Sequence, residues 1–287
     1  MSGSLVLIAS FPKSGNTWIR IFLERLKFGP DHPINSLDGG LQGMLRRQVF
    51  DTLVPVNAAD LLSDEIEFFL PDVYRRFVAE FEGDAFVKVH DTARRNLQGE
   101  WLFPTDSVRL VIYVVRHPFD VAVSMACHFG STPERAVDFM GLEEQERRVS
   151  KATDAMPEDF GSWSSNVSSW LDGPYAVTMV RYEDLLATPM EQFSCIAAVA
   201  GVRVTSDQLS LVVEATRFER LQSEEMRTGF VERPGGSLRF FRSGRAKCWE
   251  GVLDPAMRGR IVAEHGVVMK RLGYTADGDT LPMPAQA

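Results

Sequence analysis

The chain has 287 residues, of which 39 are acidic and 31 are basic, so its formal net charge is −8. This length and an apolar content of 45% fit one sizeable α/β domain or two small ones, and we expect one. The acidic balance argues against nucleic acid or an anionic membrane as a general partner. Any anion that the protein binds therefore needs a local site.

The first residues, "MSGSLVLIAS", lack a basic region and reach only a short apolar run before Pro12. We therefore expect neither a signal peptide nor a membrane anchor. The cysteines, Cys127, Cys195 and Cys248, are widely spaced and odd in number. This pattern favours free thiols in a reducing cytoplasm over disulfides or a zinc site, so we expect a cytoplasmic protein.

Strand and helix patterns alternate along the chain. Apolar, β-branched runs of strand length lie at 5–11, 85–91, 107–116 and 175–182. Helical patterns cover 18–28, 64–81, 118–129, 133–150, 188–200, 206–222 and 255–272. Thr17 is a candidate cap for the first helix. The order predicts an α/β fold in which a central parallel sheet is flanked by helices on both faces.

Two segments, 29–43 and 228–251, have no clear period, and we expect them to be long functional loops. The polar end of the chain, "DGDTLPMPAQA", favours a frayed tail. We therefore predict a single domain over residues 1–275 and a flexible C-terminal tail over 276–287.

The segment "PKSGNT" (12–17) joins the first predicted strand to the first predicted helix. A helix N-terminus offers free N–H groups and a positive dipole end, and Lys13, Ser14 and Thr17 add a charge and two hydroxyls. This arrangement predicts a phosphate or sulfate site. The P-loop of nucleotide triphosphatases places its lysine after two glycines, whereas Lys13 precedes a single one, Gly15. An exposed turn lysine beside a helix cap is an equally good interpretation of this spacing alone.

Three blocks of the sequence resemble, in the same order, blocks of the cytosolic sulfotransferases. "PKSGNTW" (12–18) is similar to that family's phosphosulfate-binding loop, and "VVRHPFDVAVSM" (114–125) to its 3′-phosphate block. "FRSGRAKCW" (241–249) resembles its late block R-K-G-x-x-G-D-W, from which Ser243, Lys247 and Cys248 depart. The resemblance spans nearly the whole chain.

The resemblance implies a P-loop-like sulfotransferase fold and a donor, 3′-phosphoadenosine-5′-phosphosulfate (PAPS), whose product is adenosine 3′,5′-bisphosphate (PAP). The sulfuryl group would move to a hydroxyl or amine of a small-molecule acceptor. The two anionic ends of the donor match two basic sites in the sequence, one at the Lys13 loop and one at Arg116 with Ser124. The expected cofactor-binding residues are Lys13, Ser14, Gly15, Asn16, Thr17, Trp18, Arg116, Ser124, Tyr182, Arg242, Ser243 and Gly244.

The resemblance also places the catalytic histidine at His90 in "VKVHD" (87–91). Lys88 lies two residues earlier, so both side chains share one face of the strand end. A neutral imidazole can take the acceptor proton, Lys13 would stabilise the leaving oxygen, and Lys88 would stabilise the transferring group. We take His90, Lys13, Lys88 and Ser124 as catalytic candidates and expect no metal.

Two other functions stay open. A non-catalytic binder of adenosine bisphosphate would keep the anion sites but could dispense with Lys88 and His90. An atypical P-loop kinase would need Mg²⁺ and an acidic strand end, which the sequence does not support. Arg116 could instead pair with Asp120, and Trp18 could be a core aromatic, as could Tyr182. The acceptor is not readable, and the family's dimerisation motif is not kept, which leaves the oligomeric state open.

Overall fold

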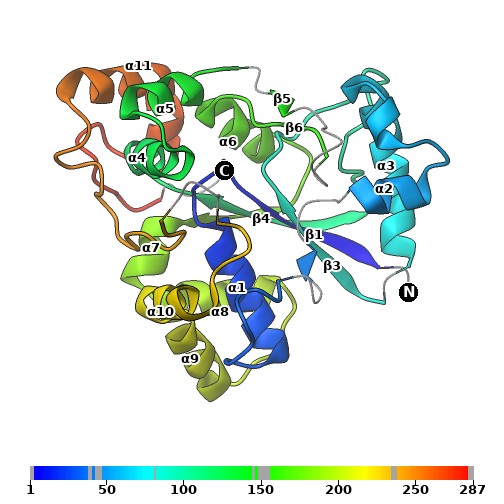
Figure 1. The fold of residues 1–287 in the computed structure, drawn as a ribbon, viewed down its shortest axis with the longest axis horizontal. Helices are drawn as coiled ribbons and strands as arrows, with labels where there is room; N and C mark the ends of the chain where they lie inside the picture. The colour runs from blue at the N-terminus through cyan, green and yellow to red at the C-terminus, as the bar shows by residue number, and fades with distance from the viewer. Residues whose placement is uncertain are drawn as a thin grey trace.

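The computed structural model describes residues 3–37, 41–42, 47–80, 82–143, 146–147, 156–233 and 238–283. At its centre is a five-stranded sheet in the order β2-β3-β1-β4-β7 (Figure 1), in which every pairing is parallel. Its strands are β1 Ser4–Ala9, β2 Leu41–Gln42, β3 Asp84–Val89, β4 Val108–Val115 and β7 Val177–Arg181. All four predicted strands are confirmed, and only the short edge strand β2 was not predicted.

Helices cover both faces of this sheet, as predicted. One face carries α1 and α7 to α10, and the other carries α2 to α6 and α11 (Figure 1). The helices are α1 Asn16–Phe28, α2 Arg47–Leu53, α3 Ser63–Ala79, α4 Pro118–Phe129, α5 Pro133–Met140, α6 Trp163–Leu171, α7 Tyr182–Ala187, α8 Pro189–Val199, α9 Ser206–Ala215, α10 Phe218–Thr228 and α11 Pro255–Arg271. A 3₁₀ turn, Ala58–Asp60, precedes α3.

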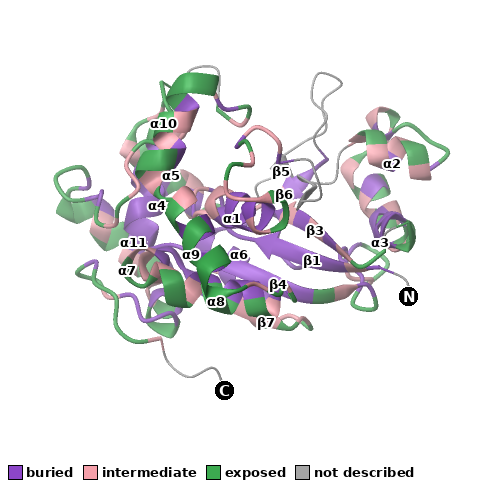
Figure 2. Cartoon of the chain, turned by 90° about the horizontal axis from the view of Figure 1, so that it is seen from below, coloured by how far each residue is buried: buried purple, intermediate pink, exposed green. Residues whose placement is uncertain are grey.

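The central strand β1 shows why the strand sequences are almost continuously apolar. Leu5 and Leu7 pack into the core under α3, α4 and α6, whereas Val6 and Ile8 pack into the core under α1 and α8. Figure 2 shows β1 and β4 largely buried, whereas β3 and β7 on either side of them are only partly buried. A strand that is covered on both faces needs apolar side chains at odd and even positions alike.

Two predicted helices are wrong in extent. The helix predicted over 133–150 ends at Met140, because its apolar spacing stops there and Leu142 is exposed. Further on, Glu146–Arg147 (β5) pairs with Glu158–Asp159 (β6) in a separate antiparallel ladder. The helix predicted over 206–222 is two helices: α9 ends at Ala215, where Arg25 and Trp18 of α1 donate to the carbonyl oxygens of Ala215 and Thr216, and α10 begins at Phe218.

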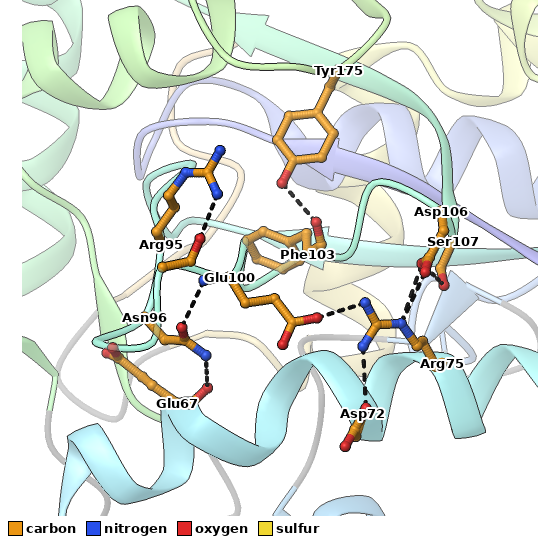
Figure 3. A network of polar contacts seen from close by, with 11 residues as sticks. Glu67, Asp72, Arg75, Arg95, Asn96, Glu100, Phe103, Asp106, Ser107 and Tyr175 are labelled. Carbon is orange, nitrogen blue, oxygen red and sulfur yellow. Dashed lines mark hydrogen bonds and ion pairs between the residues drawn. The ribbon is translucent and has the colours of Figure 1, made fainter.

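An exposed ion-pair network fastens α3 to the connection between β3 and β4 (Figure 3). Arg75 of α3 lies 3.1 Å from Asp72, 2.6 Å from Glu100 and 3.0 Å from Asp106. One exposed pair contributes little, but a guanidinium shared among three carboxylates has a defined geometry. The network therefore holds the segment that follows β3 against the α3 layer.

The C-terminal tail, predicted to be flexible from residue 276, packs against the domain over its described part. Tyr274 and Thr280 form an antiparallel bridge, and the Leu281 carbonyl accepts a hydrogen bond from Arg181 at 2.6 Å. Asp279 pairs with Lys247 at 2.6 Å. Backbone hydrogen bonds and this one ion pair tie the described residues of the tail to the domain, and the flexibility of the tail stays a prediction. Residues 284–287 lie outside the described residues.

Candidate active site

The carboxyl ends of the parallel strands bring distant segments to one edge of the sheet. The register pairs Ala9 of β1 with Val89 of β3, and Val115 of β4 with Arg181 of β7. The residues that follow these strands therefore meet, as they do at the ligand-binding edge of open α/β sheets. They line a cavity of about 540 Å³, closed on its other side by residues 240–244. This is the volume of a typical small-molecule site.

The loop from β1 to α1 has an unusual backbone. Lys13 has φ +71° and Gly15 has φ +112°, so two residues of the predicted anion loop lie at positive φ. A Cβ on Gly15 would lie 2.8 Å from the ring of Tyr182, which explains the glycine. The predicted cap at Thr17 is wrong, because α1 begins at Asn16 and the Thr17 hydroxyl donates to Glu232 at 3.1 Å.

Lys13 reaches into the cavity. Its Nζ lies 2.9 Å from His128 Nδ1 and 4.6 Å from the centre of the Phe240 ring. Burial, and then the positive charges of Lys88 and Arg116, lower the pKa of Lys13 to about 7. Lys13 is therefore only partly protonated at neutral pH, and a bound anion would raise its protonated fraction.

His90 follows β3 directly and is held by its ring and by its backbone. Nδ1 lies 2.7 Å from the carbonyl oxygen of Ser10, which can only accept, so Nδ1 carries the proton and Nε2 is the acceptor. Glu158 accepts from the His90 amide at 3.2 Å, and Asn166 donates to its carbonyl at 2.9 Å. Burial, and then the charge of Lys88, lower the pKa of His90 to about 3, so the ring is neutral.

Lys88 and His90 both line the cavity, as their spacing predicted. Lys88 Nζ lies 3.9 Å from Glu232, a carboxylate that comes from the loop after α10. Glu232 also accepts a hydrogen bond at 2.6 Å from Arg20, a residue of α1 that is 2% exposed. Burial raises the pKa of Glu232, but the charges of Lys88 and Arg20 outweigh it and bring that pKa down to about 2.

The second predicted anion site begins where β4 ends. The Arg116 guanidinium lies 4.4 Å from the centre of the Tyr182 ring, and its Nη2 donates to the carbonyl of Arg245 at 3.0 Å. The alternative pairing with Asp120 is also present, but it is long, at 3.9 Å. Ser124, two turns into α4, lines the same cavity. The guanidinium of Arg116 is thus buried, held in place by Tyr182 and Arg245, and only weakly paired with the Asp120 carboxylate.

The late block forms a defined turn at the residues where its sequence departs from the family pattern. Lys247 stands where the pattern has glycine, and its φ of +58° is one that glycine adopts readily. Asp120 fixes the turn, because it accepts from the amides of Lys247 at 2.8 Å and Trp249 at 3.2 Å. Cys248 is buried and lies with its Sγ 2.9 Å from the Ser243 hydroxyl.

The two predicted nucleotide aromatics line the cavity and also belong to the packed interior. Trp18 donates from its indole N–H to the carbonyl of Thr216 at 2.8 Å and meets Tyr182 edge-on at 5.7 Å. Tyr182 is 8% exposed, and burial raises its pKa. Both aromatics are therefore rigid parts of the cavity wall.

The structure gathers nearly all of the predicted site residues in this one cavity. Those that line it are Lys13, Gly15, Asn16, Thr17, Trp18, Lys88, His90, Arg116, Ser124, Tyr182, Arg242, Ser243 and Gly244. Ser14 is the exception, since its side chain is buried behind the loop. In the described part of the chain, the Ser14 hydroxyl and Arg116 Nε are buried without a hydrogen-bond partner.

Sequence reasoning missed the groups that support these side chains. Ser10 acts through its backbone carbonyl, which no side-chain pattern reveals, and Asn166 lies on α6, which was not predicted. Glu232 and Arg20 were missed although "VERPGG" contains the one acid that lines the cavity among the described residues. The available signal was that Glu232 is an acidic residue within an arginine-rich segment, while the predicted site contains lysines from other parts of the chain.

The described ranges contain no group of three His, Cys, Asp or Glu side chains arranged to hold a metal ion. No helix within them has both the length and the apolar character needed to cross a bilayer.

The chain matches known proteins over most of its length. The family model of the sulfotransferase domain matches residues 4–273. Cytosolic sulfotransferase 5 of Arabidopsis thaliana is 24% identical over 89% of this chain and 76% of its own, and sulfotransferase 1A1 of Canis lupus familiaris is 24% identical over 94% and 85%.

Solved structures share the fold at lower identity. Mouse sulfotransferase SULT7A1, solved with PAP, superposes with a TM-score of 0.59 at 18% identity, over 93% of this chain and 85% of its own. Retinol dehydratase, solved with androsterone and PAP, gives 0.61 at 17% identity, over 94% and 82%. With the family model matched from β1 to the end of α11, the chain belongs to the sulfotransferase family, and its curated relatives are of the cytosolic type.

Proposed function

We propose that this protein transfers the sulfuryl group of PAPS to a hydroxyl or amine of a small-molecule acceptor. The observation that carries the proposal is the meeting, in one cavity, of the Lys13 loop, of Lys88 with His90, and of Arg116 with Ser124. SULT7A1 and retinol dehydratase were both solved with PAP, which supports the choice of donor.

The residues present fit a donor with two anionic ends. Arg116 Nε and the Ser14 hydroxyl are buried donors without partners, which is costly unless a bound group satisfies them. Arg116 and Ser124 would hold the 3′-phosphate, with Arg242 and Gly244 beside them, while Lys13 and the N-terminus of α1 would hold the phosphosulfate end. Gly244 has no room for a side chain, because a Cβ there would meet the Phe218 ring at 2.1 Å.

His90 is arranged to remove a proton. When bound, PAPS supplies the sulfuryl group and a nucleotide that leaves as an anion. The Ser10 carbonyl holds the proton on Nδ1 of His90, so that Nε2 presents a lone pair to the acceptor and an imidazolium would keep its hydrogen bond. Burial, and then the charge of Lys88, lower the pKa of the ring, and an anion that offset the charge of Lys88 would remove the second of these effects.

Lys13 and Lys88 supply the positive charge. Both project into a partly enclosed cavity, where fixed cations act more strongly on developing negative charge than they do in water. Phe160 and Phe240 line the cavity beside them and limit the access of water. These rings also support an acceptor with an apolar body that carries the reacting hydroxyl or amine.

We propose a cytoplasmic location as well, which the names of the cytosolic relatives support.

Incubation with ³⁵S-labelled PAPS and a panel of phenols, alcohols and amines tests the proposal. The expected result is a labelled product together with PAP in equal amount. An atypical kinase would instead transfer phosphate from ATP with Mg²⁺. A non-catalytic binder would bind PAP and form no product with any acceptor in the panel, and either outcome contradicts the proposal.

A further inference from the structure

Glu232 is an acid at the centre of a cationic site. Its Oε1 accepts from Arg20 at 2.6 Å, its Oε2 accepts from Thr17 at 3.1 Å, and Lys88 lies 3.9 Å from Oε2. These partners come from the first turns of α1 and from the end of β3. Both carboxylate oxygens are therefore occupied by donors of the chain itself.

The position of Glu232 argues against a simpler role. Each of its oxygens already accepts a hydrogen bond from the chain, so the carboxylate is held in place without a ligand. A surface pair that merely anchored the loop would lie in solvent, where it contributes little. Arg20 is instead 2% exposed, and a buried guanidinium without a counter-charge is strongly destabilising.

The other charged and titratable groups around the cavity are nearly all basic. These groups come from the loop after β1, from α1, from the ends of β3 and β4, from α4 and from the late block. They are Lys13, Arg20, Lys88, His90, Arg116, His128 and Arg242. Burial, and then the repulsion of neighbouring cations, lower the pKa values of Lys13, His90 and His128, whereas Glu232 raises all three. One carboxylate thus opposes the mutual repulsion of the whole cluster.

We propose that Glu232 is a positioning residue of the transfer site, whose carboxylate fixes Arg20, Thr17 and Lys88 and supplies the counter-charge that keeps the cluster cationic. This rests on the proposed function, since it concerns the same donor site. An anion binds more tightly to neighbouring cations that are already protonated, because no proton then has to be taken up on binding. Glu232 favours the protonated state of these cations from the loop after α10, so the position of that loop and the charge of the site are coupled.

The pH dependence of PAP binding distinguishes this role from a structural one. Affinity measured by calorimetry from pH 6 to 9 should fall where Lys13 loses its proton in the free protein. Glu232→Gln removes the charge but keeps the shape, so this fall should begin at a pH lower by roughly one unit, the size expected for one nearby charge at an effective dielectric constant of about 20. Titration of the ligand's own phosphates is common to all variants and cancels in their ratio.

Two matched variants serve as controls. Glu232→Asp keeps the charge and should keep the wild-type position of the fall, even if the loop is loosened. Glu225→Gln disturbs the same loop from outside the cavity, because Glu225 accepts from the amides of Phe240 and Phe241, and it should leave the position unchanged. Glu232→Ser is also neutral and leaves room for water beside Arg20, so it repeats the test if Glu232→Gln does not fold.

The curves of Glu232→Gln and wild type should also cross. At pH 5, measured in addition, Lys13 is protonated in both proteins and removal of the acid should strengthen PAP binding, and at pH 9 the order should reverse. An unshifted fall in both neutral variants would overturn the inference, as would a loss of affinity equal to that of Glu225→Gln at every pH. Wild-type protein that binds no PAP at any pH would overturn the proposed function instead.

Discussion

Replacement of Arg116 is the sharpest perturbation of the two-site account of donor binding. The guanidinium is fixed by the Arg245 carbonyl at 3.0 Å and by the face of Tyr182, and its side chain is 10% exposed. If it binds the 3′-phosphate, Arg116→Ala should remove one charge-assisted contact, which is about 1.5–3 kcal/mol. This corresponds to a loss of roughly 10- to 150-fold in the affinity for PAP.

The assay compares two nucleotides that differ only in the 3′-phosphate. Calorimetry on the wild type should show PAP binding much more tightly than adenosine 5′-phosphate. Arg116→Ala should remove most of this difference, since adenosine 5′-phosphate never engages the site. Arg109→Ala is the matched control, because Arg109 lies at the opposite end of β4, 38% exposed and paired with Asp84. It should leave both affinities unchanged.

Equal affinities of the wild type for the two nucleotides would refute the two-site reasoning. So would an Arg116→Ala protein that weakens both nucleotides by the same factor, because this would mean that Arg116 only supports the late block.

Two further predictions concern Lys13 and the late block. The pKa of Lys13 is lowered to about 7 and its charged form is the one that binds an anion, so kcat/KM should fall as the pH rises through 7. Lys13→Ala should lower both PAP affinity and turnover and should abolish this fall. A wild-type pH profile of kcat/KM that is flat to pH 9 would contradict the prediction. The late block should gain protection from hydrogen exchange at residues 238–248 when PAP binds, since its arginines repel one another without an anion, and unchanged protection at saturating PAP would argue against closure over the nucleotide.

The sheet could be predicted because its strands are covered on both faces, and a short, continuously apolar run such as "LVLIASF" is typical of such a strand. Helix ends were harder to predict, because they depend on tertiary contacts. α6 reads as a serine-rich segment, yet Ser162 caps it and Trp163, Val167 and Trp170 bury one face. The break after Ala215 coincides with side chains of α1 that donate to the carbonyl oxygens of Ala215 and Thr216, a tertiary contact that spacing does not show.

The candidate site was predictable to the extent that it depends on side chains at fixed spacing. The Lys13 loop, the Lys88 and His90 pair and the Arg116 block each lie within a few residues of a strand end, so the topology alone brings them together. Glu232 lies in a segment without a period, and its role depends on Arg20, which is more than 200 residues away in the chain. The tautomer of His90 depends on a backbone carbonyl. Both are properties of the folded chain, so a sequence pattern does not reveal them.

The single-turnover rate of His90→Ala tests the central claim most directly. Protein saturated with PAPS is mixed with a competent acceptor, and sulfated product is followed by rapid quench, with PAP affinity measured in parallel. If His90 takes the acceptor proton, the transfer rate should fall by roughly 10²- to 10⁴-fold while PAP affinity stays within about twofold. A His90→Ala protein that transfers at the wild-type rate would contradict the account and would point to His128, beside Lys13, as the base.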